Sequence, residues 1–172
     1  MPTKTKRQIW VKARSAVNEL GDGLGYRVDP GIRDMLASFH VNGLSTTASC
    51  EGHSHRGLSH PWIDVGVLAP PDWGHIKEWV KDVRKINVLR KKNFVEAKKV
   101  YLLLEEFYRR RTAPPDARLI LERMALDYRL QSAGASMTEF LLKGERLKKI
   151  RVFQKEMNAF GAFLKKRFFE KK

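Results

Sequence analysis

The sequence of 172 residues contains a single cysteine. One cysteine forms no intramolecular disulfide and builds no four-cysteine zinc site, which excludes a secreted disulfide-rich scaffold. No apolar run approaches the roughly 20 residues that a membrane-spanning helix needs, and no apolar signal-peptide stretch follows the basic residues near the start. We therefore expect a cytoplasmic protein without a membrane partner.

Acidic residues are also scarce, with 19 aspartates and glutamates against 34 lysines and arginines, for a net charge of +15. The imbalance is one-sided: residues 1–80 hold nine basic and eight acidic residues, whereas residues 81–172 hold 25 and 11. A one-sided basic excess attracts polyanions. The sequence therefore favours RNA or DNA as a partner of the basic 81–172 region, and a solvated, highly charged surface is the alternative.

With 42% hydrophobic and 31% charged residues, the composition is that of an ordinary globular chain. Its length suits a single domain, residues 1–172, that can bury an adequate core. Within it we expect three parts: an N-terminal helix and turn over residues 1–28, an α+β core over 29–135, and a long helix over 136–172.

The first third of the chain predicts two helices. Apolar residues recur every three or four positions between residues 9 and 20, as in an amphipathic helix. The glycine-rich segment 21–25 follows this helix instead of a strand, so we expect a turn and not a dinucleotide-binding loop. Asp29 is then expected to cap a second helix, with Pro30 at the first helical position.

Three later segments predict strands. Residues 44–49 are small and β-prone, and residues 62–68 are apolar and followed by two prolines. Residues 118–132 alternate with period two, which favours a pair of strands, although their leucines, glutamate and arginines would also suit a helix.

Two further helices are expected between the second strand and the third. Asp72 is expected to cap one that carries Trp79 and Val83. Asn93 and Glu96 have the spacing of a capping box, which predicts the start of the other helix, over residues 94–111.

A long amphipathic helix is expected over residues 138–169. Its apolar positions step by three or four and its remaining positions are mostly basic. The aromatic end, with Phe160, Phe163 and Phe168, is expected to pack in the core or against a second copy of the chain, giving a homodimer. The predicted fold class is thus α+β, with a small sheet of about four strands covered by helices and a long C-terminal amphipathic helix.

Reactive side chains gather in residues 49–60, which hold the only cysteine and three of the five histidines. Loops next to strands are frequent places for binding and catalytic groups. One hypothesis is a metal site, because Cys50, His53, His55 and His60 offer a thiolate and imidazoles that suit zinc or iron. Asp64 and Glu51 would add oxygen ligands.

A second hypothesis is acid–base or nucleophilic chemistry by Cys50, His53 and Glu51, since a thiol beside a histidine or Arg56 is activated. A buried, inert cysteine is the alternative.

A third hypothesis is ligand binding, because hydroxyls, glycines and a cation together form a cradle for phosphate or carboxylate. Trp62 would stack on a base or belong to the core, and a serine-rich turn is the alternative to a cradle. The expected ligand-binding residues are Ser49, Gly52, His55, Arg56, Trp62 and Asp64.

The string Thr47-Ala48-Ser49-Cys50-Glu51-Gly52-His53, followed by Gly57-Leu58 and Pro61-Trp62-Ile63-Asp64, resembles a family of small, functionally uncharacterised bacterial proteins with a T-x-S-C-E-G-H … P-W-[VI]-D signature. Residues 118–119 and 128–132 also look like later strands of that family. The resemblance brings no reaction with it.

Three residues of the same string, Ser49, Cys50 and Gly52, match the S-x-S-C-S-G-R pattern of the tRNA wybutosine-synthesis methyltransferase family. This resemblance implies an α+β fold and an S-adenosylmethionine-dependent reaction on tRNA. Glu51 and His53 depart from the family's pattern.

We therefore expect a protein that engages nucleic acid or a phosphorylated ligand at the 49–64 loop, with RNA modification as one reaction it could perform. The alternative from another class is a non-enzymatic interaction protein, with a zinc-stapled loop, that dimerises through its C-terminal helix.

Overall fold

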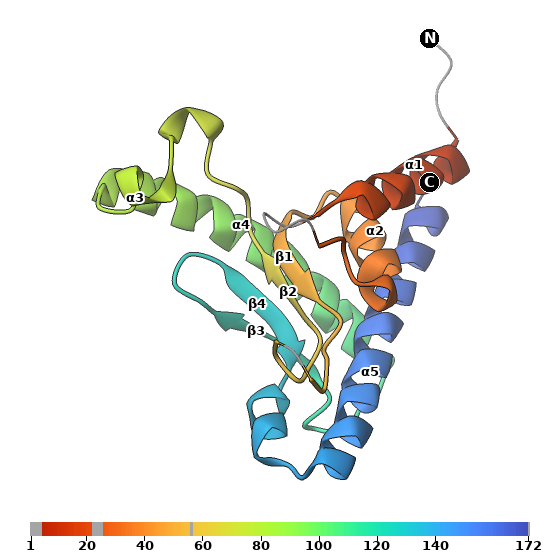
Figure 1. Cartoon of the computed structure of the whole chain (residues 1–172). Helices are drawn as coiled ribbons and strands as arrows, with labels where there is room; N and C mark the ends of the chain where they lie inside the picture. The colour runs from red at the N-terminus through yellow and green to blue at the C-terminus, as the bar shows by residue number, and fades with distance from the viewer. Residues whose placement is uncertain (1–4, 22–25, 56, 172) are drawn as a thin grey trace.

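A computed structural model describes residues 5–21, 26–55 and 57–171 (Figure 1). It has the α+β architecture expected from the sequence. Its sheet has four antiparallel strands in the order β1-β2-β4-β3, so β1 and β3 form the two edges. The strands are β1 (Thr46–Cys50), β2 (Trp62–Val65), β3 (Leu119–Arg123) and β4 (Tyr128–Ser132).

Four helices make up most of the rest: α1 (Lys6–Glu19), α2 (Arg33–Val41), α4 (Val83–Tyr108) and α5 (Lys143–Glu170). Shorter helical segments are η1 (Pro30–Ile32), η2 (Pro71–Trp73), α3 (Ile76–Trp79) and η3 (Ala135–Phe140). Within the described residues, no helix is long and apolar enough to span a bilayer. Of the glycine-rich turn expected at 21–25, residues 22–25 lie outside the described ranges, and Gly21 forms an isolated β-bridge with Arg27.

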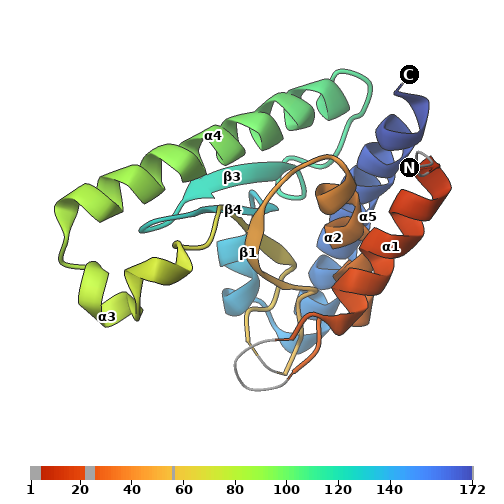
Figure 2. The ribbon, with the colours of Figure 1, turned by 90° about the horizontal axis from the view of Figure 1, so that it is seen from above.

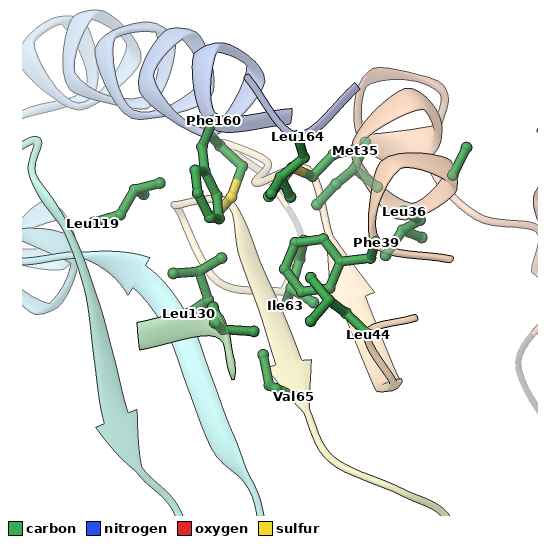
Figure 3. Close-up of a cluster of buried hydrophobic side chains, with 14 of the residues drawn as sticks. Met35, Leu36, Phe39, Leu44, Ile63, Val65, Leu119, Leu130, Phe160 and Leu164 are labelled. Atoms are coloured by element: carbon green, nitrogen blue, oxygen red, sulfur yellow. The ribbon is translucent and has the colours of Figure 1, made fainter. Parts of the chain in front are cut away.

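The hydrophobic core lies on one face of the sheet. Ile63 pairs with Leu130 across β2 and β4, and Val65 follows two residues after Ile63, so these side chains share a face. Helices α2, α4 and α5 cover that face, with Phe39 and Phe160 among the completely buried residues (Figure 3). Helix α2 packs against both α1 and α5. Seen from above, α4 runs along the sheet (Figure 2).

The opposite face of the sheet is polar. Arg129 donates two hydrogen bonds to the carboxylate of Asp64, at 2.7 and 2.8 Å, and its guanidinium lies 4.1 Å from the ring centre of Trp62. Gln131 lies on the same face because it is two residues from Arg129 on β4. The strand pair expected over 118–132 is therefore confirmed, with one buried and one polar face.

Two helices lie between β2 and β3, as expected, but their boundaries and caps differ from the expectation. The first, α3, is a single turn that ends at Trp79, and Asp72 lies in η2 instead of capping it. The second, α4, has 26 residues and begins at Val83 instead of Phe94. The N-cap is Asp82, whose Oδ1 accepts hydrogen bonds from the backbone N–H groups of Arg84 and Lys85. Asn93 and Glu96 are not a capping box but buried residues in the middle of α4.

Asn93 and Glu96 serve tertiary hydrogen bonds instead. The Asn93 side chain accepts from the N–H of Val67 at 2.8 Å and donates to the carbonyl of Leu126 at 3.0 Å. Glu96 Oε2 accepts from the N–H of Ser45 at 3.0 Å. Both residues satisfy backbone groups at strand ends, where the sheet ladder leaves them unpaired.

The C-terminal helix begins at Lys143, five residues later than expected, because residues 135–140 form the 3₁₀ segment η3. Its aromatic end packs inside the protein. Phe160 is completely buried and lies 5.3 Å from Phe107, centroid to centroid, and Phe163 lies 5.5 Å from Phe107. These contacts favour the core-packing alternative for this helix.

Candidate functional site

The candidate site forms where the end of β1 meets the segment that precedes η1. Asp29, Cys50 and His53 each place a ligand-type atom within 4.8 Å of the other two. Asp29 Oδ2 lies 3.0 Å from His53 Nε2, and it also accepts a hydrogen bond from the backbone N–H of Glu51 at 3.2 Å. We call these three residues the Asp29–Cys50–His53 cluster. All three are half-buried.

The loop that carries the cluster depends on Gly52. Its φ is +83°, in the left-handed region. A Cβ atom at this position would lie 2.5 Å from the carbonyl carbon of His60 and 2.7 Å from the nitrogen of Pro61. Only glycine allows the chain to turn back here, after which the N–H of His53 donates to the carbonyl of Leu58 at 3.3 Å.

Two further contacts hold the loop from outside. The N–H of Gly31, in η1, donates to Glu51 Oε2 at 2.6 Å. From α5, the Gln154 side chain donates to the carbonyl oxygens of Glu51 and Gly52 at 3.0 and 3.3 Å. Glu51 is therefore anchored on three sides, and its other carboxylate oxygen lies 3.9 Å from His53 Nδ1.

A cavity of about 520 Å³ opens beside the cluster. It is lined by the whole of β1, by residues 26–29 and by Leu36, His53 and Leu68. This volume lies within the range of small-molecule binding sites. We call it the β1 cavity, and it brings Thr46 and Ser49 to the same space as the cluster. Thr47 also lines it, but its hydroxyl donates to Asp127 Oδ2 at 2.9 Å.

The structure brings together some of the predicted site residues. Ser49, Cys50 and His53 line the β1 cavity, and Glu51 contacts His53 from the side. His55 is exposed, with its ring 5.9 Å from that of His53, and it is not part of the cluster. Arg56 lies outside the described residues.

His60 belongs to a separate network. It is buried, and its Nε2 lies 3.2 Å from Gln131 Oε1, while Gln131 Nε2 donates to Glu122 at 2.6 Å. Because the amide nitrogen of Gln131 is the donor to Glu122, its oxygen must accept from His60, which fixes the proton on Nε2. Burial lowers the pKa of His60. The structure therefore does not bring His60 to the cluster.

Trp62 and Asp64 are likewise away from the β1 cavity. Both contact Arg129 on the polar face of the sheet, and the hydrogen bonds to Asp64 raise the pKa of Arg129. Asp64 and Arg129 thus form an ion pair, and Trp62 packs against the guanidinium of Arg129. The expected stacking of a base on Trp62 stays a prediction.

Sequence reasoning missed Asp29 and Gln154 as site residues. Asp29 was expected to cap a helix, but its side chain makes no capping hydrogen bond and turns to the loop instead. In the sequence, an aspartate before a proline looks the same whether its side chain caps a helix or bonds to a distant loop. Gln154 lies on a basic helix over 100 residues from the loop, and nothing in its neighbourhood distinguishes it.

A second surface of interest lies on α4. Lys91, Phe94, Lys98 and Tyr101 follow at intervals of three and four, so they share one face of the helix. All four are exposed, Phe94 by 57% and Tyr101 by 53%. We call this face the α4 stripe; it alternates basic and aromatic side chains.

Comparisons with protein-family models, with curated proteins and with solved structures found no match to this chain. The features of the described structure that bear on function are the β1 cavity, its cluster and the α4 stripe.

Proposed function

We propose that the protein binds RNA or another phosphorylated, nucleic-acid-like ligand, with one nucleotide-sized group in the β1 cavity beside Cys50 and His53. The β1 cavity is the observation that carries this proposal. It joins a volume suited to such a group with the hydroxyl-bearing residues Thr46 and Ser49 and with the thiol of Cys50 and the imidazole of His53. Cys50, His53 and Glu51 are the proposed chemical groups, and Ser49 and Gly52 shape the place where the ligand lies.

The charge distribution supports a polyanionic ligand. Residues 81–172, which include α4 and α5, hold 14 of the 15 net positive charges. On the α4 stripe, lysines alternate with exposed aromatic rings, a combination that binds the backbone and the bases of single-stranded nucleic acid. Single-stranded RNA is therefore the probe of choice.

The resemblance to the wybutosine-synthesis methyltransferases adds S-adenosylmethionine as a proposed cofactor. Two of the three matching residues, Ser49 and Cys50, line the β1 cavity. Calorimetric titration of the protein with S-adenosylmethionine, with and without RNA, tests this part separately from RNA binding.

The test of the main proposal is fluorescence anisotropy with labelled single-stranded RNA, duplex RNA and DNA, followed by analysis of the RNA for chemical change. The variants Cys50→Ala and His53→Ala are expected to weaken binding by at least about fivefold, or to abolish a change that the wild type makes. His55→Ala is the matched control, because His55 lies on the same loop but outside the cluster. Unchanged affinity and unchanged products in both cluster variants would refute the proposal.

Homodimerisation through the C-terminal helix is the alternative from another class. It has less support, because Phe160 is completely buried within the chain and Phe163 packs on Phe107. Sedimentation at several protein concentrations distinguishes the two: a dimer through apolar contacts would persist at high salt, whereas RNA binding would not.

A further inference from the structure

We propose that the Asp29–Cys50–His53 cluster is a zinc centre with one open coordination position. This inference goes beyond the nucleic-acid function proposed above and does not depend on it. Its basis is the donor set: a carboxylate oxygen, a thiol sulfur and an imidazole nitrogen converge within 4.8 Å of one another. The three residues come from two chain segments, 21 positions apart, that meet only in the folded protein.

The spacing of the donor atoms suits tetrahedral coordination. Zinc binds sulfur at about 2.3 Å and nitrogen or oxygen at about 2.0–2.2 Å, so its ligand atoms lie on the order of 3.3–3.8 Å apart. Asp29 Oδ2 and His53 Nε2 are already 3.0 Å apart. Zinc would widen this pair slightly, and Cys50 Sγ, which lies within 4.8 Å of both atoms, would approach them by side-chain rotation.

Backbone groups of the loop prepare the cluster for a cation. The N–H of Gly52 donates to Cys50 Sγ at 3.4 Å, which orients the sulfur within the cluster. The N–H of Glu51 donates to the Asp29 oxygen that faces His53, which fixes that carboxylate. Both donors come from consecutive residues, so one short piece of backbone orients two ligands.

Glu51 lies near the ring nitrogen at which metal-binding histidines normally have an outer partner. Its Oε1 lies 3.9 Å from His53 Nδ1, on the opposite side of the ring from Asp29. His53 Nε2 is the ring nitrogen that faces Asp29, at 3.0 Å, so a metal ion would bind there in place of the present contact between the two side chains. Since Gly31 and Gln154 anchor Glu51, its position is set by η1 and α5 and not by the loop alone.

The kind of ion follows from the ligands. A thiolate with an imidazole selects zinc over magnesium or calcium, which prefer oxygen ligands. Within the described parts of the chain, three protein ligands leave a fourth position, and all three ligand residues line the β1 cavity. Three ligands and an open position are typical of catalytic zinc sites, whereas structural sites use four. Binding would displace the proton of the Cys50 thiol to solvent.

The experiment measures metal content and metal titration of the full-length, tag-free protein without RNA. Purified wild type is expected to hold one zinc per chain by elemental analysis. After removal of the metal, Co²⁺ is expected to give the ligand-field bands of a tetrahedral site and a sulfur-to-cobalt charge-transfer band. Asp29→Asn, Cys50→Ser and His53→Asn are each expected to lower zinc affinity by more than about 100-fold, since even outer partners of metal ligands contribute 10–100-fold.

His55→Asn is the matched control, and it is expected to bind zinc as the wild type does, because His55 is exposed and outside the cluster. Stoichiometric zinc in Cys50→Ser, or a folded wild type that binds no zinc, would overturn the proposal. If a cluster variant fails to fold by circular dichroism, the cobalt spectrum of the wild type decides alone: absence of the sulfur-to-cobalt band overturns the centre. RNA binding by metal-free protein is measured separately, so the two proposals fail independently.

Discussion

Gly52 sets the geometry of the candidate site through its backbone alone. We predict that Gly52→Ala destabilises the protein by about 2–4 kcal/mol, because the new Cβ adds a clash with the His60–Pro61 backbone to the cost of a positive φ. Urea unfolding measures this loss.

Gly57→Ala is the control, since Gly57 also has a positive φ, +57°, but nothing lies within 4 Å of its Cβ position. It should cost only about 1–2 kcal/mol. Equal losses of unfolding free energy in the two variants would show that the short distance between Gly52 and the His60–Pro61 backbone does not contribute to the cost.

His60 is predicted to make the stability of the protein fall in mild acid. Burial lowers its pKa, so the folded protein resists protonation while the unfolded chain takes up a proton near pH 6.5. The stability that His60 provides is therefore complete above pH 6.5. It is lost as the pH falls from there toward the lowered pKa, by at most about 1.4 kcal/mol per pH unit.

Unfolding free energies at several pH values between 7.5 and 5 test this. His60→Gln should be less stable than the wild type at pH 7.5 by about 1–2 kcal/mol, and the gap should narrow as the pH falls. His40→Gln, at an exposed position of α2, should give a curve parallel to that of the wild type. Parallel curves for His60→Gln would contradict the prediction.

At the scale of single elements, α4 connects the segments next to three strands. Glu96 bonds to Ser45 before β1, and Asn93 bonds to Val67 after β2 and to Leu126 before β4. We predict that Asn93→Ser costs about 2–3 kcal/mol, because serine cannot reach both the N–H of Val67 and the carbonyl of Leu126. Serine is as good an N-cap as asparagine. If Asn93 were a helix cap, the stability of Asn93→Ser would therefore be close to that of the wild type. Thermal unfolding of the two proteins distinguishes a capping role from a tertiary one.

The sequence predicts an element well when the alternation of apolar and polar residues within that element is enough to specify it. The alternation in 118–132 gives β3 and β4 because one face is buried and the other polar. Asn93 and Asp29 were misinterpreted for a shared reason: a polar residue that caps a helix and one that bonds to a distant loop look the same in a local window. Local composition singles out Cys50 and His53 as candidates, whereas Asp29 is brought beside them only by the fold.

At the scale of the whole molecule, positive charge is concentrated after residue 80. We predict that Lys91→Glu with Lys98→Glu, on the α4 stripe, weakens single-stranded RNA binding by at least about tenfold near 100 mM salt. The slope of log K against log salt should shrink by roughly 1.4, since each lost phosphate contact contributes about 0.7.

Arg7→Glu with Lys12→Glu makes the same change of total charge on exposed positions of α1 and is the matched control. It should reduce affinity much less, through long-range charge alone. If the two double variants behave alike, net charge and not the α4 stripe governs binding.

Gln154 also has a consequence for the order in which the protein is made. It follows Glu51 by 103 residues, and its hydrogen bonds to the loop need α5 in place. At about 5–20 residues per second, translation reaches Gln154 on the order of 5–20 seconds after the loop. During that interval a ribosome-bound chain already carries Asp29, Cys50 and His53 but lacks the contact that anchors their loop. The loop therefore gains its anchor from α5 only after synthesis has passed Gln154.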